Sequence, residues 1–496
     1  MTLFFKSYKN LYKDSVSLMQ MTASLASESK INNLSIAMQT EANIERAKAS
    51  GINLSLLPSP NDLMVVFNAD DKKIADQIFS LIDSKLNNQE TETTDQKKEK
   101  TFTSILQAKE AKPKLNLALI SVPGAFAAAE ALKALKANLN VMIFSDNVSE
   151  EDELLLKQEA TSRKLLVMGP DCGTCVINGY PLGFANILMR GDIGLVGASG
   201  TGLQEVSCAI SNRGCGVSQV IGTGGRDLHE KIGGLSMLFA LDLLNQDPNT
   251  KIICVISKPP ALTVKEKIIA KLKSFKKPCV VHFLGESNKQ QRDENIYYED
   301  SLIECANSCC LLSLGEKNIE KQTSYVISCK NKPSGFIRGI FCGGTFCAEM
   351  QNVALKAGLS LSSNVPIPGV PSLPKDQPLE NAFIDMGDDE FTNGKPHPMI
   401  DPTQRDMAIL KHAKDRNVKV IVFDVVLGIG SNQAPIENLL NIIKTVKRPD
   451  LNFICHVCGT NEDPQNRQGI INSLTKLGVK VAKSNYEAAI MAINNI

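Results

Sequence analysis

The chain has 496 residues, of which 43% are hydrophobic, so at ~150 residues per domain it is long enough for three or four domains. Lys and Arg number 54 against 53 for Asp and Glu, which argues against nucleic acid or an anionic membrane as the main partner. No apolar run approaches the ~18–20 residues of a membrane span, and residues 1–15 lack the features of a signal peptide. We therefore predict a cytoplasmic protein.

Fourteen cysteines are scattered through apolar runs. In a long chain without a signal peptide, reduced and buried thiols are the simplest expectation. Two Cys-x-x-Cys pairs, Cys172/Cys175 and Cys455/Cys458, can in principle close one zinc site. They lie far apart in the sequence, and the first pair falls in a glycine-rich turn with another proposed role, so we assign no metal to them.

Residues 1–85 have the pattern of a small α/β domain. Strands are expected at 4–7, 31–40 and 62–69, and helices at 14–29, 41–50 and 71–86. Residues 86–114 are polar, charged and nearly free of aromatic side chains, which predicts a flexible linker.

Residues 115–190 predict a parallel, doubly wound domain. Apolar strands are expected at 115–122, 140–146 and 165–171, and helices at 125–139 and 149–164. Ligands of such sheets bind beyond the carboxyl ends of the strands. The loops 121–125, 145–147 and 169–174 would all emerge at that edge.

Two further modules, 191–330 and 331–496, each open with a strand, a glycine-rich turn and a helix. The first helical N–H groups have no intrahelical partner and carry partial positive charge, so each turn is a candidate anion site. A single turn of this kind is as often only tight packing, but two facing turns would hold a phosphate from both sides. The candidate phosphate-binding residues are Ser199, Gly200, Thr201, Gly202, Gly343, Gly344 and Thr345.

The fold class that follows is α/β, with several doubly wound, mostly parallel, flavodoxin- or Rossmann-like domains and a small N-terminal α/β domain. Several strings then point to a known family. The order and spacing of GPDCGT (169–174), GDIGLVGASGTGLQE (191–205) and IGTGG (221–225) resemble the succinyl-CoA synthetase α subunit, whereas FIDMGDD (383–389) and FDVVLGIGS (423–431) resemble the ligase domain of its β subunit. Over the whole chain the FdrA family is still more similar, through DSVSLM (14–19), NLALISVPG (116–124), GGRDL (224–228), RDEN (292–295), GKPHPMIDP (394–402) and GTNEDPQ (459–465).

The resemblance implies a CoA-binding-like domain at 115–190, an α-like ligase domain at 191–330 and a β-like ligase domain at 331–496. It also implies that Gly169, Pro170, Asp171 and Gly173 border a substrate or CoA pocket. Pro123, Gly124, Asp146 and Asn147, from the other two loops expected at that sheet edge, complete the predicted pocket. Asp171 and Gly173 replace the Asn and Pro of the synthetase loop. Glu205 matches a position just inside the phosphate-binding helix.

The departures from the synthetase concern phosphate transfer. Its active-site histidine follows the strand that is matched here by PCVVHFLG (278–285), but the next residues of this chain contain no histidine. His282 lies in the strand itself and is expected to be a core group. The nucleotide-binding ATP-grasp domain and a Walker-type loop are also missing from the sequence. This chain alone is therefore not expected to phosphorylate itself from ATP.

His397 is the most interesting of the five histidines, because the prolines on either side hold it in a stiff segment. It is a candidate acid, base or phosphate ligand, with a capping or core role as the alternative. The candidate catalytic residues are His397, Glu205 and Arg226. The carboxylates of Asp388, Asp389 and Asp401 suit Mg²⁺ together with phosphate, but such residues also form turns, and Asp227 and Arg292 are further candidates for polar contacts near an anion.

Three functions are compatible with these features. FdrA-type proteins are associated with oxamate carbamoyltransferase in allantoin breakdown, which implies exchange of oxalurate and phosphate with oxamate and carbamoyl phosphate, alongside companion subunits. A phosphate cradle without a phosphohistidine suits this direct reaction. The alternatives are an acyl-CoA synthetase, which needs a histidine and a nucleotide domain from elsewhere, and a scaffold subunit that binds acyl phosphate or CoA without turnover. Phosphate or acyl phosphate, CoA and Mg²⁺ are the ligands considered, and a homodimer is plausible.

Overall fold

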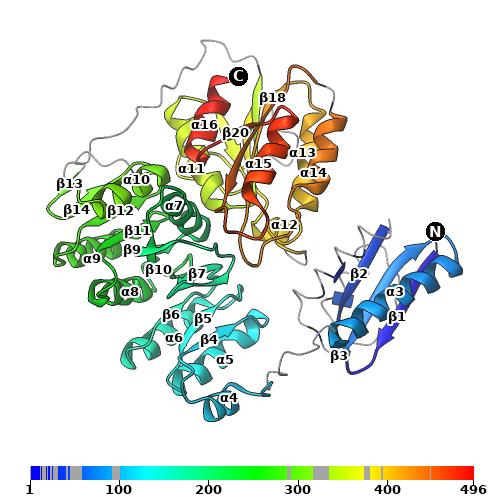
Figure 1. Cartoon of the computed structure of the whole chain (residues 1–496), viewed down its shortest axis with the longest axis horizontal. Helices are drawn as coiled ribbons and strands as arrows, with labels where there is room; N and C mark the ends of the chain where they lie inside the picture. Colours follow the sequence, from blue (N-terminus) through cyan, green and yellow to red (C-terminus); the bar gives the residue numbers. More distant parts are fainter. Residues whose placement is uncertain are drawn as a thin grey trace. The chain divides into compact units, whose positions relative to one another are not determined.

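The computed structural model describes residues 2–11, 13, 18, 21–22, 25, 32–40, 43–44, 59–91, 101–286, 292–316, 335–373, 380–392, 395–446 and 448–496. The chain divides into two compact units, residues 1–101 with 392–396, and residues 102–391 with 397–496 (Figure 1). In the described part of the chain, no helix is both long enough and apolar enough to cross a membrane.

The N-terminal unit contains an antiparallel sheet with the strand order β1-β3-β2. Its elements are β1 (Thr2–Tyr8), β2 (Asn32–Gln39), β3 (Ser59–Ala69) and α3 (Lys72–Thr91). The central strand β3 alternates between two apolar faces, and Leu63, Val65 and Phe67 pack with α3 in one core. The three strands and the helix expected at 71–86 are confirmed, whereas the helices expected at 14–29 and 41–50 lie mostly outside the described residues.

The predicted linker 86–114 is corrected in part. Helix α3 continues to Thr91, and α4 (Ile105–Ala111) forms further along, while 92–100 lie outside the described residues. Ser104 starts α4 by accepting a hydrogen bond from the Gln107 N–H, and the Lys109 ammonium donates to the Leu115 carbonyl at 2.6 Å. These local hydrogen bonds give order to a segment whose composition suggested none.

The second unit begins with a parallel sheet, β4-β5-β6, as predicted for this region. Its elements are β4 (Leu117–Ile120), α5 (Gly124–Lys136), β5 (Asn140–Ile143), α6 (Glu150–Ser162) and β6 (Val167–Met168). Small alanines on α5 let the helix approach the apolar strands closely, and four of its residues are fully buried.

An eight-stranded sheet follows, with the order β13-β14-β12-β11-β9-β10-β7-β8. Its strands are β7 (Thr174–Ile177), β8 (Tyr180–Gly183), β9 (Arg190–Ala198), β10 (Val217–Gly222), β11 (Ile252–Ser257), β12 (Cys279–Phe283), β13 (Arg292–Asp293) and β14 (Ile296–Tyr298). The helices are α7 (Gly200–Asn212), α8 (Leu235–Gln246), α9 (Leu262–Lys273) and α10 (Leu302–Ser313). Strand β9 lies between β10 and β11 and pairs in parallel with both. The glycine-rich turn that follows β9 therefore starts from the middle of the sheet.

The last sheet has six parallel strands in the order β16-β17-β15-β18-β19-β20. Its strands are β15 (Phe336–Phe341), β16 (Leu361–Ser363), β17 (Asn381–Asp385), β18 (Val418–Val426), β19 (Asn452–Cys458) and β20 (Lys480–Ala482). The helices are α11 (Gly344–Lys356), α12 (Asp389–Thr392), α13 (Thr403–Ala413), α14 (Glu437–Thr445), α15 (Arg467–Lys476) and α16 (Asn485–Asn494). Strand β15 is again central, with β17 on one side and β18 on the other.

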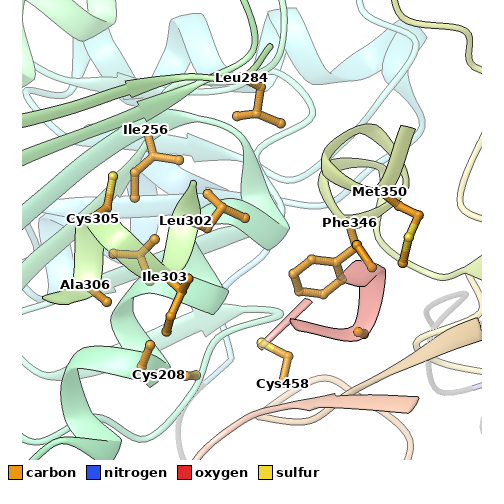
Figure 2. Packing of buried hydrophobic residues seen from close by; sticks show 14 of the residues in the cluster. Cys208, Ile256, Leu284, Leu302, Ile303, Cys305, Ala306, Phe346, Met350 and Cys458 are labelled. Carbon is orange, nitrogen blue, oxygen red and sulfur yellow. The ribbon is translucent and has the colours of Figure 1, made fainter. Parts of the chain in front are cut away.

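The two large sheets share one continuous apolar core. Residues of α7 and α10 pack in the same cluster as residues of α11, α16 and β19. Figure 2 shows part of it, with Cys208 and Ile303 from the first module and Phe346 and Cys458 from the second. Because α7 and α11 both contribute to this core, the glycine turns that precede them are brought together.

Candidate functional site

The two glycine-rich turns meet at the start of α7 and α11. The hydroxyl oxygens of Ser199 and Thr345 lie 2.6 Å apart and share a hydrogen bond. A Cβ on Gly343 would lie 2.7 Å from the Thr201 methyl carbon, and one on Gly202 would lie 3.2 Å from the Thr345 methyl carbon and 2.5 Å from the Ser199 hydroxyl oxygen of its own turn. Glycine is therefore required on both sides for the turns to approach this closely. The prediction of facing turns is confirmed in its geometry.

The two turns differ in which backbone donors stay open. Neither helix has a side-chain cap, and within the described residues the N–H groups of Gly200, Thr201 and Gly202 bond to no other group. In the second turn, the Cys342 and Gly343 N–H groups donate to the Asp424 carboxylate at 2.7 and 3.0 Å.

The N–H of Gly343, a residue predicted to bind phosphate, therefore already has an internal carboxylate as its acceptor, and phosphate binding at this turn stays a prediction. Open donors remain at the start of α7, and within the described residues the Gly344 and Thr345 N–H groups at the start of α11 also bond to no other group, so an anion between the turns would gain from both helix dipoles.

Asp385 ends β17 and lies beside the start of α11. A Cβ on Gly344 would come within 2.6 Å of one carboxylate oxygen of Asp385. The other oxygen accepts the Gly387 N–H at 2.9 Å. Burial raises the pKa of Asp385 to about 7; the Gly387 N–H and the Lys258 ammonium oppose the increase, while Asp424 and Asp388 add to it. A carboxyl that titrates near neutral pH beside a helix start is suited to acid–base chemistry.

His397 faces the same small space. A Cβ on Gly387 would lie 2.6 Å from His397 Nε2 and 3.2 Å from Asp385 Oδ1. His397 Nδ1 accepts the Met399 N–H at 3.2 Å, so the neutral ring carries its proton on Nε2. Burial lowers the pKa of His397 to about 4. The imidazole is therefore neutral at pH 7 and offers a hydrogen-bond donor rather than a positive charge.

Lys258 connects this site to the loop 169–174. It follows the central strand β11, is exposed, and acts electrostatically on both Asp385 and Asp171. Asp171 is solvent-accessible but surrounded by protein, and loss of hydration followed by the charge of Asp146 raises its pKa to about 6. The three modules thus bring one lysine and two weakly acidic carboxyls to one place.

The predicted substrate pocket consists of tightly packed loops. A Cβ on Gly124 would lie 2.3 Å from the Asp146 carbonyl oxygen and 2.5 Å from that of Asn147. The Gly169–Pro170 peptide bond is cis, and the Asp171 N–H donates to the Ser145 carbonyl. These contacts bring the loops 121–125, 145–147 and 169–174 together. Pro123 directly precedes α5, and the Gly173 carbonyl accepts the Phe184 N–H.

Two of the predicted catalytic residues have other partners. The Glu205 carboxylate is buried, lies 2.6 Å from His456 Nε2, and accepts the Asn485 N–H. Arg226 donates to the Glu153 carboxylate at 3.0 Å and to the Val148 carbonyl at 2.7 Å. These contacts hold modules together, and the catalytic roles of both residues stay predictions.

Several other candidates have structural roles in this fold. His282 is buried, hydrogen-bonds to the Glu299 carbonyl and has a pKa lowered to about 4 by burial, which confirms it as a core group. Asp401 accepts the N–H and the hydroxyl of Thr403, and Asp388 accepts the Glu390 N–H, as turn-forming residues do. Asp227 belongs to a buried ion-pair cluster with Lys157.

Sequence reasoning missed Asp385, Lys258 and Asp424. All three lie in or directly after parallel strands, near the carboxyl end where ligands bind. The signal was present in the strings FIDMGDD and ISKPP, but only the strand order shows that their ends meet.

Comparison with known proteins fits this architecture. A CoA-ligase family model matches residues 340–494, and a CoA binding domain model matches residues 190–285. The protein YahF of Escherichia coli (strain K12) is 40% identical over 499 residues, covering 97% of this chain and 96% of YahF. The chain belongs to the FdrA-like succinyl-CoA synthetase family. As a family member it is a ligase-like enzyme chain, and the CoA binding match falls on 190–285 rather than on the expected 115–190.

More distant family members match in part. The α subunit of the ADP-forming succinate–CoA ligase of Aquifex aeolicus (strain VF5) is 27% identical over 176 residues, which is 34% of this chain and 56% of that subunit. Among solved structures, an acetyl-coenzyme A synthetase of Ca. Korarchaeum cryptofilum in complex with phosphate and ADP covers 81% of this chain and 87% of its own, with a TM-score of 0.37 and 14% identity.

A third family model, described as the AllF heavy metal-associated domain, matches residues 1–102. That segment contains neither Cys nor His, so it offers no thiolate or imidazole ligand to a heavy metal. Its Asp83 carboxylate is bonded to Lys6 and Tyr8. The residues of this domain do not fit a heavy-metal site.

Proposed function

We propose that this protein transfers a carbamoyl group to and from phosphate without a phosphorylated enzyme intermediate. The reaction is oxalurate plus phosphate giving oxamate plus carbamoyl phosphate. The observation that carries this proposal is the meeting of the two glycine turns, with open donors at the start of α7 and Lys258 near Asp385. A site with this composition suits a phosphate dianion beside an acid–base carboxyl.

The position of the histidines supports direct transfer. The loop after β12 begins Leu284-Gly285-Glu286, and the sequence has no histidine between His282 and His397. His282 itself is buried and bonded to a backbone carbonyl. His397 has its proton on Nε2, the nitrogen nearest Gly387, which suits hydrogen-bond donation rather than attack on phosphorus.

The proposed chemistry assigns a role to each group. Phosphate, held at Ser199 to Gly202 and Lys258, attacks the carbamoyl carbon through one oxygen, and the carbon–nitrogen bond to the oxamate nitrogen breaks. The leaving nitrogen takes a proton from Asp385, and the proton of the attacking phosphate returns to that carboxylate. The His397 Nε2–H stabilises the negative oxygen of the tetrahedral carbon, a contribution that grows in the transition state.

CoA ligation is the second candidate. It is favoured by the matches to the CoA-ligase and CoA binding domain models. The turns and Lys258 would then bind an acyl phosphate that CoA attacks, and the nucleotide-binding part would come from a companion chain. Under either reaction, the proposal also includes companion subunits, a homodimer, bound Mg²⁺ and a cytoplasmic location.

Carbamoyl phosphate formation tests the choice directly. Purified protein is mixed with oxalurate and phosphate, and ³¹P NMR follows the product. We expect product without ATP or CoA, and no ³²P on the protein after incubation with γ-³²P-ATP. Turnover that requires CoA and ATP, with base-stable and acid-labile ³²P on the chain, would establish the ligase instead.

A lysine pair supplies the matched control. Lys258→Ala is expected to raise the KM for phosphate about tenfold or more, because a hydrogen bond to a charged group contributes ~1.5–3 kcal/mol. Lys251→Ala removes another exposed lysine, one that pairs with Asp192, and should leave KM unchanged. Equal effects of the two substitutions on the KM for phosphate would show that Lys258 does not bind phosphate.

A further inference from the structure

A second group of reactive side chains lies in the core shared by the two large modules. Within the described residues, Glu205, His456 and Cys458 form the group whose ligand atoms lie close enough to hold a metal ion, all within 4.8 Å of one another. Each of the three is buried. The Cys208 thiol is a neighbour of the Cys458 thiol but lies outside this 4.8 Å group, so its side chain would have to turn toward the other three to become a fourth ligand. Figure 2 shows both cysteines in this core.

Local geometry explains how four residues converge. Glu205 and Cys208 are three residues apart on α7 and so share one helix face. His456 and Cys458 are two residues apart on β19 and so share one face of the sheet. Cys455 packs in the core on the other side. Cys455 and Cys458 therefore lie on opposite faces of the sheet, and only Cys458 faces the cluster.

Neighbouring groups orient the cluster as outer-shell partners do in metal sites. His456 Nε2 faces Glu205 at 2.6 Å, while its Nδ1 lies 3.4 Å from the Ala482 carbonyl oxygen. The second Glu205 oxygen accepts the Asn485 N–H at 3.3 Å. A histidine whose far nitrogen bonds to a backbone carbonyl, and a carboxylate held by a further donor, are the usual arrangement around a bound metal.

We propose that these four side chains form a structural zinc-type site that ties the two large modules together. Two thiolates, one imidazole and one carboxylate form the nitrogen, sulfur and oxygen set that tetrahedral Zn²⁺ prefers. Bonds of ~2.0–2.3 Å place the ligand atoms of a tetrahedral ion ~3.3–3.8 Å apart. The His456–Glu205 distance of 2.6 Å must then open by roughly 1 Å.

Charge and proton balance are consistent with this site. Binding of Zn²⁺ releases one proton from each thiol and the proton shared by His456 and Glu205. Two thiolates, one carboxylate and the ion leave a net charge of −1. Arg467, whose charge acts on Cys208, lies close enough to offset it. Since two ligands come from α7 and two from β19, the ion would link one module to the other.

The alternative is a metal-free ion pair between His456 and Glu205 beside two thiols. The two cases differ in metal content. The full chain, expressed with zinc, is desalted and analysed by mass spectrometry for metals. We expect about one zinc per chain, as in other closed four-ligand sites. Replacement by Co²⁺ should produce a thiolate-to-cobalt charge-transfer band and a tetrahedral spectrum.

Substitutions locate the ion. Cys458→Ser and Cys208→Ser should lose most of the metal and the charge-transfer band, whereas Cys455→Ser, a buried cysteine of the same strand, should keep both. A metal-free native protein that also gives no thiolate band with added Co²⁺ overturns the proposal even if the serine variants do not fold. Equal metal loss from the Cys455→Ser variant overturns it too.

Discussion

Asp385→Asn is expected to make the protein more stable at alkaline pH while abolishing most of its activity. Burial raises the pKa of Asp385 from 3.8 to about 7, with Lys258 opposing and Asp424 and Asp388 reinforcing the increase. Between these two values the folded protein keeps a proton that the unfolded chain has released. The free energy of unfolding therefore falls as the pH rises from about 4 to about 7.

The magnitude follows from the shift. Roughly three pKa units at ~1.36 kcal/mol each give up to about 4 kcal/mol of lost stability above pH 7. Asparagine carries no charge at any pH, and its amide oxygen can still accept the Gly387 N–H. The Asp385→Asn variant should therefore melt several degrees higher than the parent at pH 8 and at the same temperature near pH 4. Because Asp385 is the proposed general acid, its replacement should lower kcat by ~10²–10⁴-fold.

Thermal melting monitored by circular dichroism at pH values from 4 to 8, with turnover measured on the same samples, checks both effects. Asp450→Asn is the control, because Arg448 and Lys419 hold the pKa of that exposed carboxyl below its usual range. Its removal should lower stability at neutral pH, the opposite sign. A melting temperature of Asp385→Asn at or below that of the parent at pH 8 would refute the pKa reasoning, and unchanged turnover would remove Asp385 from the chemistry.

Two further substitutions test how the modules are held. Lys157→Met should cost about 3–5 kcal/mol in urea unfolding, because it leaves the buried Asp227 carboxylate without its cationic partner and Glu153 with Arg226 alone. A loss under 1 kcal/mol would mean that water or another cation replaces the lysine. Gly343→Ala should lower both the melting temperature and turnover, since its Cβ would lie 2.7 Å from the facing turn, whereas Gly225→Ala meets nothing within 4 Å and should change neither. Equal behaviour of the two alanine variants would show that the turns can separate without effect.

The sequence by itself determined the architecture and one half of the site. Continuous apolar strands and amphipathic helices specified parallel sheets, and the strings at 197–202 and 342–345 specified glycine turns at helix starts. These features are local, because turn and helix-start chemistry depends on a few consecutive residues. The role of His282 as a core group also followed from its place inside an apolar strand.

Only the tertiary structure decided which groups face one another. That Asp424 occupies the Gly343 N–H, that Asp385 and Lys258 border the turns, and that Glu205 pairs with His456 all depend on contacts between residues far apart in the chain. Periodicity shows which face of an element is apolar but not which other element covers it. Cys455 and Cys458 differ for the same reason: strand alternation sends them to opposite faces, and only the packing of α7 against β19 gives one of them partners.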